Sequence, residues 1–338
     1  MRRLACLFGL AAACLAAGLP AAAGGYRAPR TVFGAPDLEG VWDSASLTAL
    51  ERDPEFKTLV VSDAAADAYE RRSNDPDQID AGFRKARPNA PYVGGAHNEW
   101  IAYSTLARIG GQARTSILID PPDGKLPLTP AARARLRARR LLELRNFDAP
   151  EARPPAERCI APSGPPMLTG DTFQILQTRD AVVIAMESGS EARVIRLGDR
   201  RHLPAALAPW MGDSVGWWEG ETLAVETVNF NPGHALWSYT SRTPISPQAK
   251  VTERFSRIAA GVILYRFTVE DPVNYARPWS GVLPLNAYAG RLFEAACHEG
   301  NYALGNILAG ARRVERDGGV PEPLDGGDPP PKPPGATP

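Results

Sequence analysis

The chain has 338 residues, and its 38 lysines and arginines balance its 38 aspartates and glutamates to a formal net charge of zero. This balance argues against a nucleic-acid-binding protein, which needs a strongly positive surface. The one basic run, residues 132–145, is interpreted as the solvated face of an amphipathic helix.

The first 23 residues have the three parts of a secretory signal peptide. Arg2 and Arg3 precede an apolar run over residues 4–19, and an Ala-x-Ala cleavage pattern ends at Ala23. The apolar run is shorter than the roughly 20 residues that a membrane-spanning helix needs. We therefore expect residues 1–23 to be removed, leaving a periplasmic or secreted protein with no integral membrane segment.

Two of the four cysteines, Cys6 and Cys14, lie in this signal peptide. The mature chain keeps Cys159 and Cys297. In an oxidising compartment, two cysteines in a globular chain most simply form one disulfide. The alternative is a free, nucleophilic Cys297.

Residues 24–150 are expected to mix helices with extended chain. The sequence DLEGVWDSASL predicts an early strand, and Asp120–Gly124 has the prolines and glycine of a turn that follows a second strand. A helix is predicted to begin at Pro130, with Thr129 as its N-cap.

Residues 151–313 contain short runs that alternate apolar with polar residues or are rich in β-branched residues, separated by Gly, Asp, Asn or Pro. This pattern is typical of an antiparallel meander, with hairpins predicted in WWEGETL and RIAAGVILY. We expect a mainly β protein whose meander closes into a lipocalin-like barrel or a sandwich, because closure removes exposed strand edges. With the mixed N-terminal part it would form a single domain over residues 24–313.

The last segment, residues 314–338, is rich in proline and glycine and has almost no apolar residues. Such a segment buries too little surface to offset the entropy of ordering. It is predicted to be a disordered tail.

No glycine-rich phosphate loop, serine nucleophile elbow, Cys-x-x-Cys or His-Glu-x-x-His motif is present. The four histidines stand singly, so neither a metal site nor a cofactor is predicted. General acid–base chemistry needs only a titratable group beside a positioned partner. The candidate residues for it are His298, Glu299, Arg193 and Asp213, each of which also fits a surface charge or a structural ion pair.

Aromatic residues are frequent in the β-rich part, where they could line an apolar cavity or form ordinary core. The sequence thus supports two hypotheses. In the first, the protein binds a small apolar or aromatic molecule inside a barrel. In the second, it is a cofactor-independent lyase, isomerase or hydrolase with a His–carboxylate acid–base pair in the same cavity. The predicted ligand-binding residues are Trp217, Trp237, Tyr275, Arg277, Trp279 and Tyr302.

Several motifs together resemble a large family of secreted bacterial proteins. They are DLEGVWDSASLTALER, DPPDGKLPLTP, WMGDSVGWWEGETLAVETVNFN and FEAACHEGNYALGNILAGAR. The resemblance covers most of the mature chain. It implies an exported single-domain protein and does not imply a particular activity.

Overall fold

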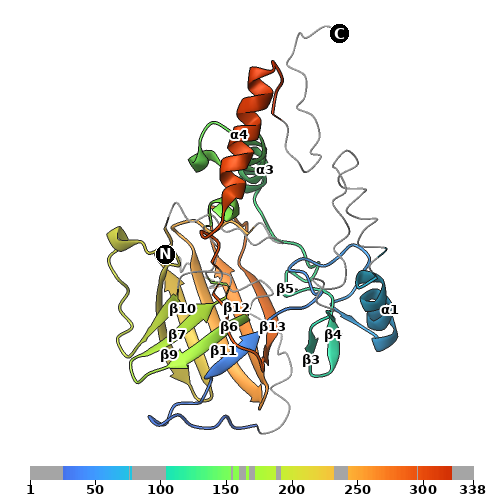
Figure 1. Cartoon of the computed structure of the whole chain (residues 1–338). Helices are drawn as coiled ribbons and strands as arrows, with labels where there is room; N and C mark the ends of the chain where they lie inside the picture. Colours follow the sequence, from blue (N-terminus) through green and yellow to red (C-terminus); the bar gives the residue numbers. More distant parts are fainter. Residues whose placement is uncertain are drawn as a thin grey trace, which may run out of the picture.

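The computed structural model describes residues 26–75, 77, 104–153, 155–159, 165–166, 172–187, 192–231, 243–294 and 296–321. The expected signal peptide and most of the expected tail lie outside these ranges. The described chain forms a β-barrel with a small sheet and three helices beside it (Figure 1). The prediction of a mainly β protein is confirmed.

The main sheet has ten strands, and all of them except β5 (Leu118–Asp120) close into a ring. Strand β1 closes the ring because it pairs on both sides, with Trp42 opposite Phe173 of β6 and Ala287 of β13. In ring order the strands are β1 (Gly40–Asp43), β6 (Thr172–Gln177), β7 (Ala181–Met186), β8 (Ala192–Leu197), β9 (Asp213–Glu219), β10 (Thr222–Val228), β11 (Lys250–Ala259), β12 (Val262–Glu270) and β13 (Trp279–Ala287).

One neighbouring pair in the ring, β8–β9, is parallel, with Ile195 opposite Ser214. A closed ring with an odd number of strands cannot alternate direction all the way round, so at least one parallel pair is required. Residues 198–212 make the connection by crossing the outside of the barrel, with a short 3-10 helix η3 (Ala205–Leu207) (Figure 1). This pair departs from the antiparallel meander that the sequence predicts, since a crossover has no strand pattern of its own.

The two ends of the barrel differ. We call one the hairpin end, because the connections there are the tight turns at 178–180, 220–221 and 260–261. Leu38 is buried near this end: its N–H donates to Gln177 Oε1 over 2.6 Å, and its carbonyl accepts from Trp42 Nε1 over 3.0 Å. We call the other the loop end, where strands are joined through residues 187–191, 229–249 and 271–278.

Both predicted hairpins, β9–β10 and β11–β12, are present. The alternation expected along β10 is also present, because Leu223, Val225 and Thr227 are buried inside the barrel while Glu226 lies on its outer face. Other strands add to the same core, with Phe173, Ile175, Ile184, Ile195, Phe255, Phe267 and Leu285.

The N-terminal part lies beside the barrel (Figure 1). It contains β2 (Val60–Val61), β3 (Arg108–Ile109) and β4 (Gln112–Arg114) in one sheet, with α1 (Asp63–Ser73) against it. A small core of Ala66, Leu106 and Ala113 holds this sheet and helix together. Strand β5 joins this part to the barrel through its pairing with β13.

Two longer helices, α3 (Pro130–Arg145) and α4 (Tyr302–Arg316), stand together beyond the barrel (Figure 1). Thr129 caps α3 as predicted, because its Oγ1 accepts from the Ala132 N–H over 3.1 Å. Helix α4 continues past residue 314, where the tail was expected to begin. None of the described helices has the length and apolar character needed to cross a bilayer.

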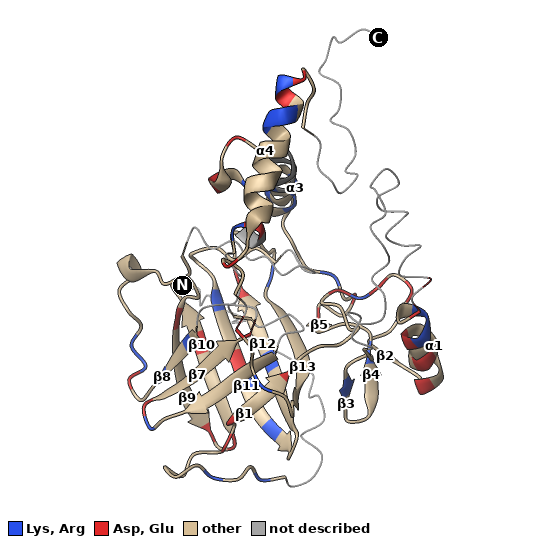
Figure 2. Cartoon of the chain, viewed as in Figure 1, with Lys and Arg blue, Asp and Glu red and all other residues tan. Residues whose placement is uncertain are grey.

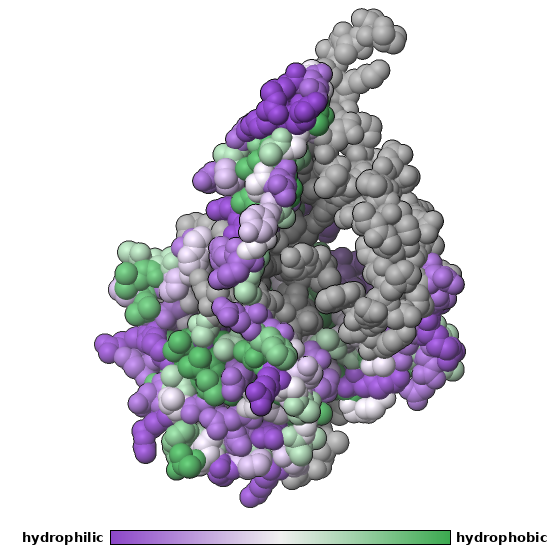
Figure 3. Space-filling model, in the orientation of Figure 1, coloured by the Kyte–Doolittle hydropathy of each residue, from purple (hydrophilic) through white to green (hydrophobic). Residues whose placement is uncertain are grey.

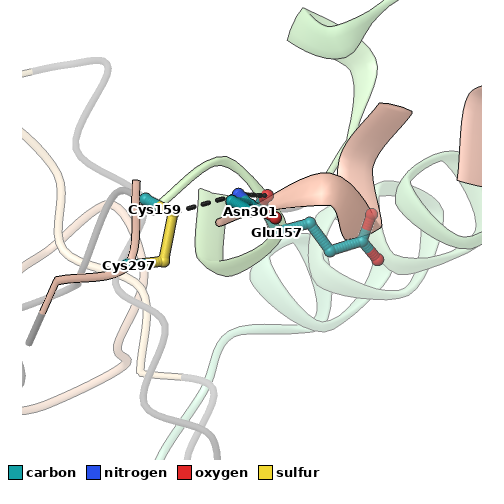
Figure 4. The surroundings of a disulfide bond; sticks show 4 residues. All are labelled: Glu157, Cys159, Cys297 and Asn301. Atoms are coloured by element: carbon teal, nitrogen blue, oxygen red, sulfur yellow. Dashed lines mark hydrogen bonds between the residues drawn. A yellow bond between two sulfur atoms is a disulfide. The ribbon is translucent and has the colours of Figure 1, made fainter. Parts of the chain in front are cut away.

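The predicted disulfide between Cys159 and Cys297 is present, with the two Cα atoms 5.6 Å apart. Cys159 follows the 3-10 helices η1 (Pro150–Ala152) and η2 (Pro155–Arg158), and Cys297 precedes α4. Asn301 reinforces the link by donating to Cys159 Sγ over 3.1 Å and to the Glu157 carbonyl over 3.2 Å (Figure 4). The bond therefore ties the start of α4 to the segment after α3.

Replacing both cysteines by serine is expected to lower the free energy of unfolding by about 2–4 kcal/mol, since a bridge that closes so long a loop restricts the unfolded chain. Denaturant titration of the double variant measures this change. Reduced wild-type protein serves as the control and should match the variant. An unchanged unfolding midpoint would contradict the stabilising role of the bond.

Candidate functional site

The barrel interior contains a buried ion pair towards the loop end. The side chains of Arg193 on β8 and Glu253 on β11 are 3 % and 0 % exposed. Arg193 Nη1 donates to Glu253 Oε1 over 2.9 Å, and Nη2 donates to Oε2. Charged positions of both signs are interspersed along the barrel strands (Figure 2), but these two side chains point inward.

Three hydroxyl groups complete the hydrogen bonding of this pair. Arg193 donates to Ser214 Oγ over 3.1 Å and to Thr227 Oγ1 over 2.9 Å. The Tyr265 hydroxyl donates to Glu253 Oε1 over 2.8 Å. We call these five residues the interior polar network.

The position of the network follows from strand direction and alternation. Arg193 and Ser214 are the second residues of the parallel strands β8 and β9, and Thr227 is the last but one of β10. All three positions are therefore near the loop end. Because alternate side chains of a strand share one face, each of them points into the barrel.

A buried ion pair adds little to stability by itself. Desolvation costs several kcal/mol for each ion, and well-packed apolar replacements of such a pair are often neutral or stabilising by about 1–4 kcal/mol. Most of the other buried side chains of the barrel are aliphatic or aromatic. The network is therefore the strongest candidate for a functional site in the described part of the chain.

An unbroken series of aromatic rings lies beside the network. Ring centroids are 4.7 Å apart for Phe255–Tyr265, 5.4 Å for Tyr265–Phe267, and 5.6 Å for both Phe267–Trp279 and Tyr275–Trp279. Tilted and edge-to-face contacts at these distances are the favourable ones for aromatic pairs. We call these five residues the aromatic wall, and Tyr265 belongs to both groups.

Gly281 on β13 makes room for this wall. A Cβ atom at this position would lie 2.2 Å from Cζ of Phe267. The absence of a side chain lets the Phe267 ring lie directly against the β13 backbone, next to Trp279.

The loop end of the aromatic wall is fixed by polar contacts of Tyr275. Its hydroxyl donates to the Pro244 carbonyl over 3.0 Å. Burial first, and then the negative charge of Asp271, raise the pKa of Tyr275 well above its usual value, while the Trp279 indole acts in the opposite direction. The phenol therefore stays protonated at any physiological pH.

A second polar cluster lies on the outer face of the same strands. His202, in the crossover, has Nδ1 2.8 Å from Asp213 Oδ2 and Nε2 3.2 Å from Glu226 Oε1. Both contacts are hydrogen bonds when the imidazole carries both protons. Asp213 also accepts from Arg196 over 2.9 Å and from the Leu203 N–H over 2.8 Å. This cluster holds the crossover on the barrel.

The environment of Asp213 shifts its acidity. Burial by itself would raise the pKa of Asp213, but hydrogen bonds from the Leu203 N–H, Arg196 and His202 outweigh it. The net result is a pKa below the usual value, so the carboxylate is ionised and pairs with Arg196 at neutral pH.

Of the acid–base candidates, Arg193 and Asp213 lie on adjacent strands but on opposite faces of the barrel wall. His298 and Glu299 follow the disulfide and are exposed. Within the described ranges, neither side chain makes a hydrogen bond or ion pair that would join it to Arg193 or Asp213. An acid–base role for His298 stays a prediction.

The predicted ligand-binding residues separate in the same way. Trp279 and Tyr275 come together in the aromatic wall, whereas Trp217 lies outside the barrel, with the Arg200 guanidinium 3.6 Å from its ring centroid. Arg277 is on the surface, 3.2 Å from Asp120, and Tyr302 at the start of α4 is 77 % exposed. Trp237 lies outside the described residues.

Sequence reasoning missed Glu253 as the partner of Arg193, Tyr265 as a partner of Glu253, and His202 as a partner of Asp213. Alternation along β11 gives the inward direction of Glu253, but only the ring order brings β8 within reach of β11. His202 comes from a crossover without periodicity. No local signal could have paired it with Asp213.

Apolar side chains also lie on the outside of the barrel, and Figure 3 shows hydrophobic surface on the face that it presents. The exposed ones on β6, β8 and the crossover are Leu176, Val194, Leu203, Leu207 and Trp210. They point away from the interior polar network and do not belong to that site.

In the part of the chain that the structure describes, no group of three His, Cys, Asp or Glu residues is arranged to hold a metal ion. Comparison with protein-family models gave no match, and comparison with curated proteins gave no significant relative. The barrel interior is therefore the feature of the described chain from which a function is proposed.

Replacing Arg193 alone by methionine is expected to destabilise the protein by about 3–5 kcal/mol, because Glu253 is left buried without its cation. Adding Glu253→Met should recover most of that loss. Denaturant titration measures both changes.

Arg254→Met is the matched control on the same strand. Arg254 pairs with Glu219 at the surface over 3.1 Å, so its replacement should change stability by no more than about 1 kcal/mol. A double Arg193→Met, Glu253→Met variant as unstable as Arg193→Met would contradict this view of the network.

A pH dependence follows from Asp213. Its folded-state pKa is depressed, so its contribution to stability is present above the unfolded value of about 4 and is lost as the pH falls through the folded value. The stability of Asp213→Asn should therefore fall less steeply than that of wild type below about pH 4. Denaturant titrations across that range, with exposed Asp180→Asn as control, check this, and equal slopes for wild type and Asp213→Asn would contradict it.

Proposed function

We propose that the protein binds a small, largely apolar aromatic molecule inside the loop end of its barrel. Two different walls support this proposal. The interior polar network lies on β8–β12, and the aromatic wall lies on β11–β13 and the turn that holds Tyr275. An aromatic molecule with one polar group would place its ring on the aromatic wall, beside the network.

The observation that carries the proposal is the burial of Arg193 and Glu253 inside the barrel. An interior selected only for stability would gain as much from aliphatic residues at these positions. Small-molecule sites typically combine apolar and aromatic walls with a few fixed polar groups. The network supplies such groups, and its hydrogen bonds hold them in one arrangement.

The proposed place of action is the periplasm or the extracellular space. The Cys159–Cys297 disulfide supports it, since disulfides persist in oxidising compartments. The signal-peptide pattern at the N-terminus also supports export from the cytoplasm.

Photolabelling with benzophenone, a neutral aromatic ketone, tests the site directly. We expect saturable labelling of the interior residues of β11–β13, namely Tyr265, Phe267 and Trp279, identified by peptide mapping. The label should be displaced by 2-acetylnaphthalene, which has no photoreactive benzophenone group.

The outer face of the barrel provides the internal control for this experiment. Val194 and Trp217 lie on strands of the same ring but point outward. Labelling of these outward residues alone, or labelling that does not saturate, would contradict an interior binding site.

A further inference from the structure

Trp279 has an indole N–H that makes no hydrogen bond with any described residue, although its side chain is 0 % exposed. The indole N–H groups of two other tryptophans of the barrel strands are paired. Trp42 Nε1 donates to the Leu38 carbonyl over 3.0 Å, and Trp217 Nε1 donates to Glu219 Oε1 over 3.0 Å. Trp279 therefore differs from Trp42 and Trp217 in the hydrogen bonding of its indole N–H, and its burial does not explain this difference.

A buried donor without an acceptor costs free energy, and the large majority of buried polar groups in native proteins are paired. Phe267 and Tyr275 surround the Trp279 indole with their rings, at interplanar angles of 88° and 62°. The Tyr275 hydroxyl donates to the Pro244 carbonyl, and its oxygen lies near enough to the Trp279 N–H for the indole to lower the pKa of the phenol, but the two atoms do not form a well-aligned hydrogen bond. The aromatic wall thus contains one buried donor without a well-formed hydrogen bond.

We infer that the Trp279 N–H binds the acceptor atom of a neutral aromatic ligand, such as a ketone, an ester or an aza-aromatic ring. The inference rests on the proposed function and specifies the ligand chemistry of the same site. The ligand ring would lie on the aromatic wall, and its acceptor would pair with this N–H, for which the protein provides no well-aligned acceptor.

The charges near Trp279 favour a neutral ligand over an anion. The Asp271 carboxylate is buried and accepts hydrogen bonds from Ser246, Val273 and Asn274, which are all uncharged. No described Lys or Arg forms an ion pair with it. The cation of the interior, Arg193, is already paired with Glu253. A carboxylate ligand at Trp279 would therefore meet a negative field without a free cation.

Three naphthalenes of nearly equal size separate these possibilities: 2-acetylnaphthalene has a neutral acceptor, 2-ethylnaphthalene has none, and 2-naphthoate is an anion. Calorimetric titration of the full mature protein should give 2-acetylnaphthalene about tenfold tighter binding than 2-ethylnaphthalene, and 2-naphthoate weaker than both. Equal affinities of the ketone and the hydrocarbon, or tightest binding of the anion, would overturn the inference and leave the proposed function standing. Binding of none of the three would count against the proposed function itself.

Trp279→Phe keeps an aromatic ring and removes the N–H. In this variant the preference for the ketone over the hydrocarbon should disappear, whereas Trp217→Phe on the outer face should keep it. A preference retained in Trp279→Phe would overturn the assignment of the donor.

A measurement on wild-type protein covers the case in which Trp279→Phe does not fold. The indole N–H signal of Trp279 is identifiable in proton–nitrogen NMR spectra through its contacts with Phe267 and Tyr275 ring protons. Adding 2-acetylnaphthalene should move this signal downfield, as expected for a new hydrogen bond, and 2-ethylnaphthalene should not. Identical responses to the two compounds would overturn the inference.

Discussion

The closure of nine strands into a ring by β1 is the constraint on which the rest of the structure depends. Because the number is odd, two neighbouring strands must run parallel, and β8–β9 is that pair. Their shared direction places Arg193 and Ser214 side by side inside the barrel, near the same end. It also sends the crossover over the outer face, where His202 and Asp213 hold it. The inner and outer polar clusters are thus two consequences of one topological requirement.

Much of the fold could be predicted from local pattern. Alternation along β10 gave the inward face, glycine at the turns located the two hairpins, and elimination of the signal-peptide cysteines left Cys159 and Cys297 as the disulfide. Ring closure, the parallel pair and the crossover could not be predicted, because they depend on contacts between strands far apart in sequence. The full candidate site could not be predicted for the same reason. Arg193 could be named from its residue type, but Glu253 comes within reach of Arg193 only because of the order of the strands in the ring.

The barrel interior combines two environments that stabilise the fold to different degrees. The aromatic wall contributes burial and ring contacts, whereas the ion pair between Arg193 and Glu253 roughly offsets its own desolvation. Fully hydrogen-bonded networks of this kind hold their members in a single geometry. The polar network and the rings beside it would offer a preorganised surface to the proposed ligand, and Gly281 lets Phe267 lie against the β13 backbone.

A crystal structure of the protein grown with 2-acetylnaphthalene tests the central claim most directly. The account predicts density for the naphthalene inside the barrel, with its ring against Phe267 and its carbonyl oxygen within hydrogen-bond distance of Trp279 Nε1. Density for the compound only on the outer face, beside Val194 or the crossover, or a barrel interior unchanged at saturating concentration, would contradict a ligand-binding interior.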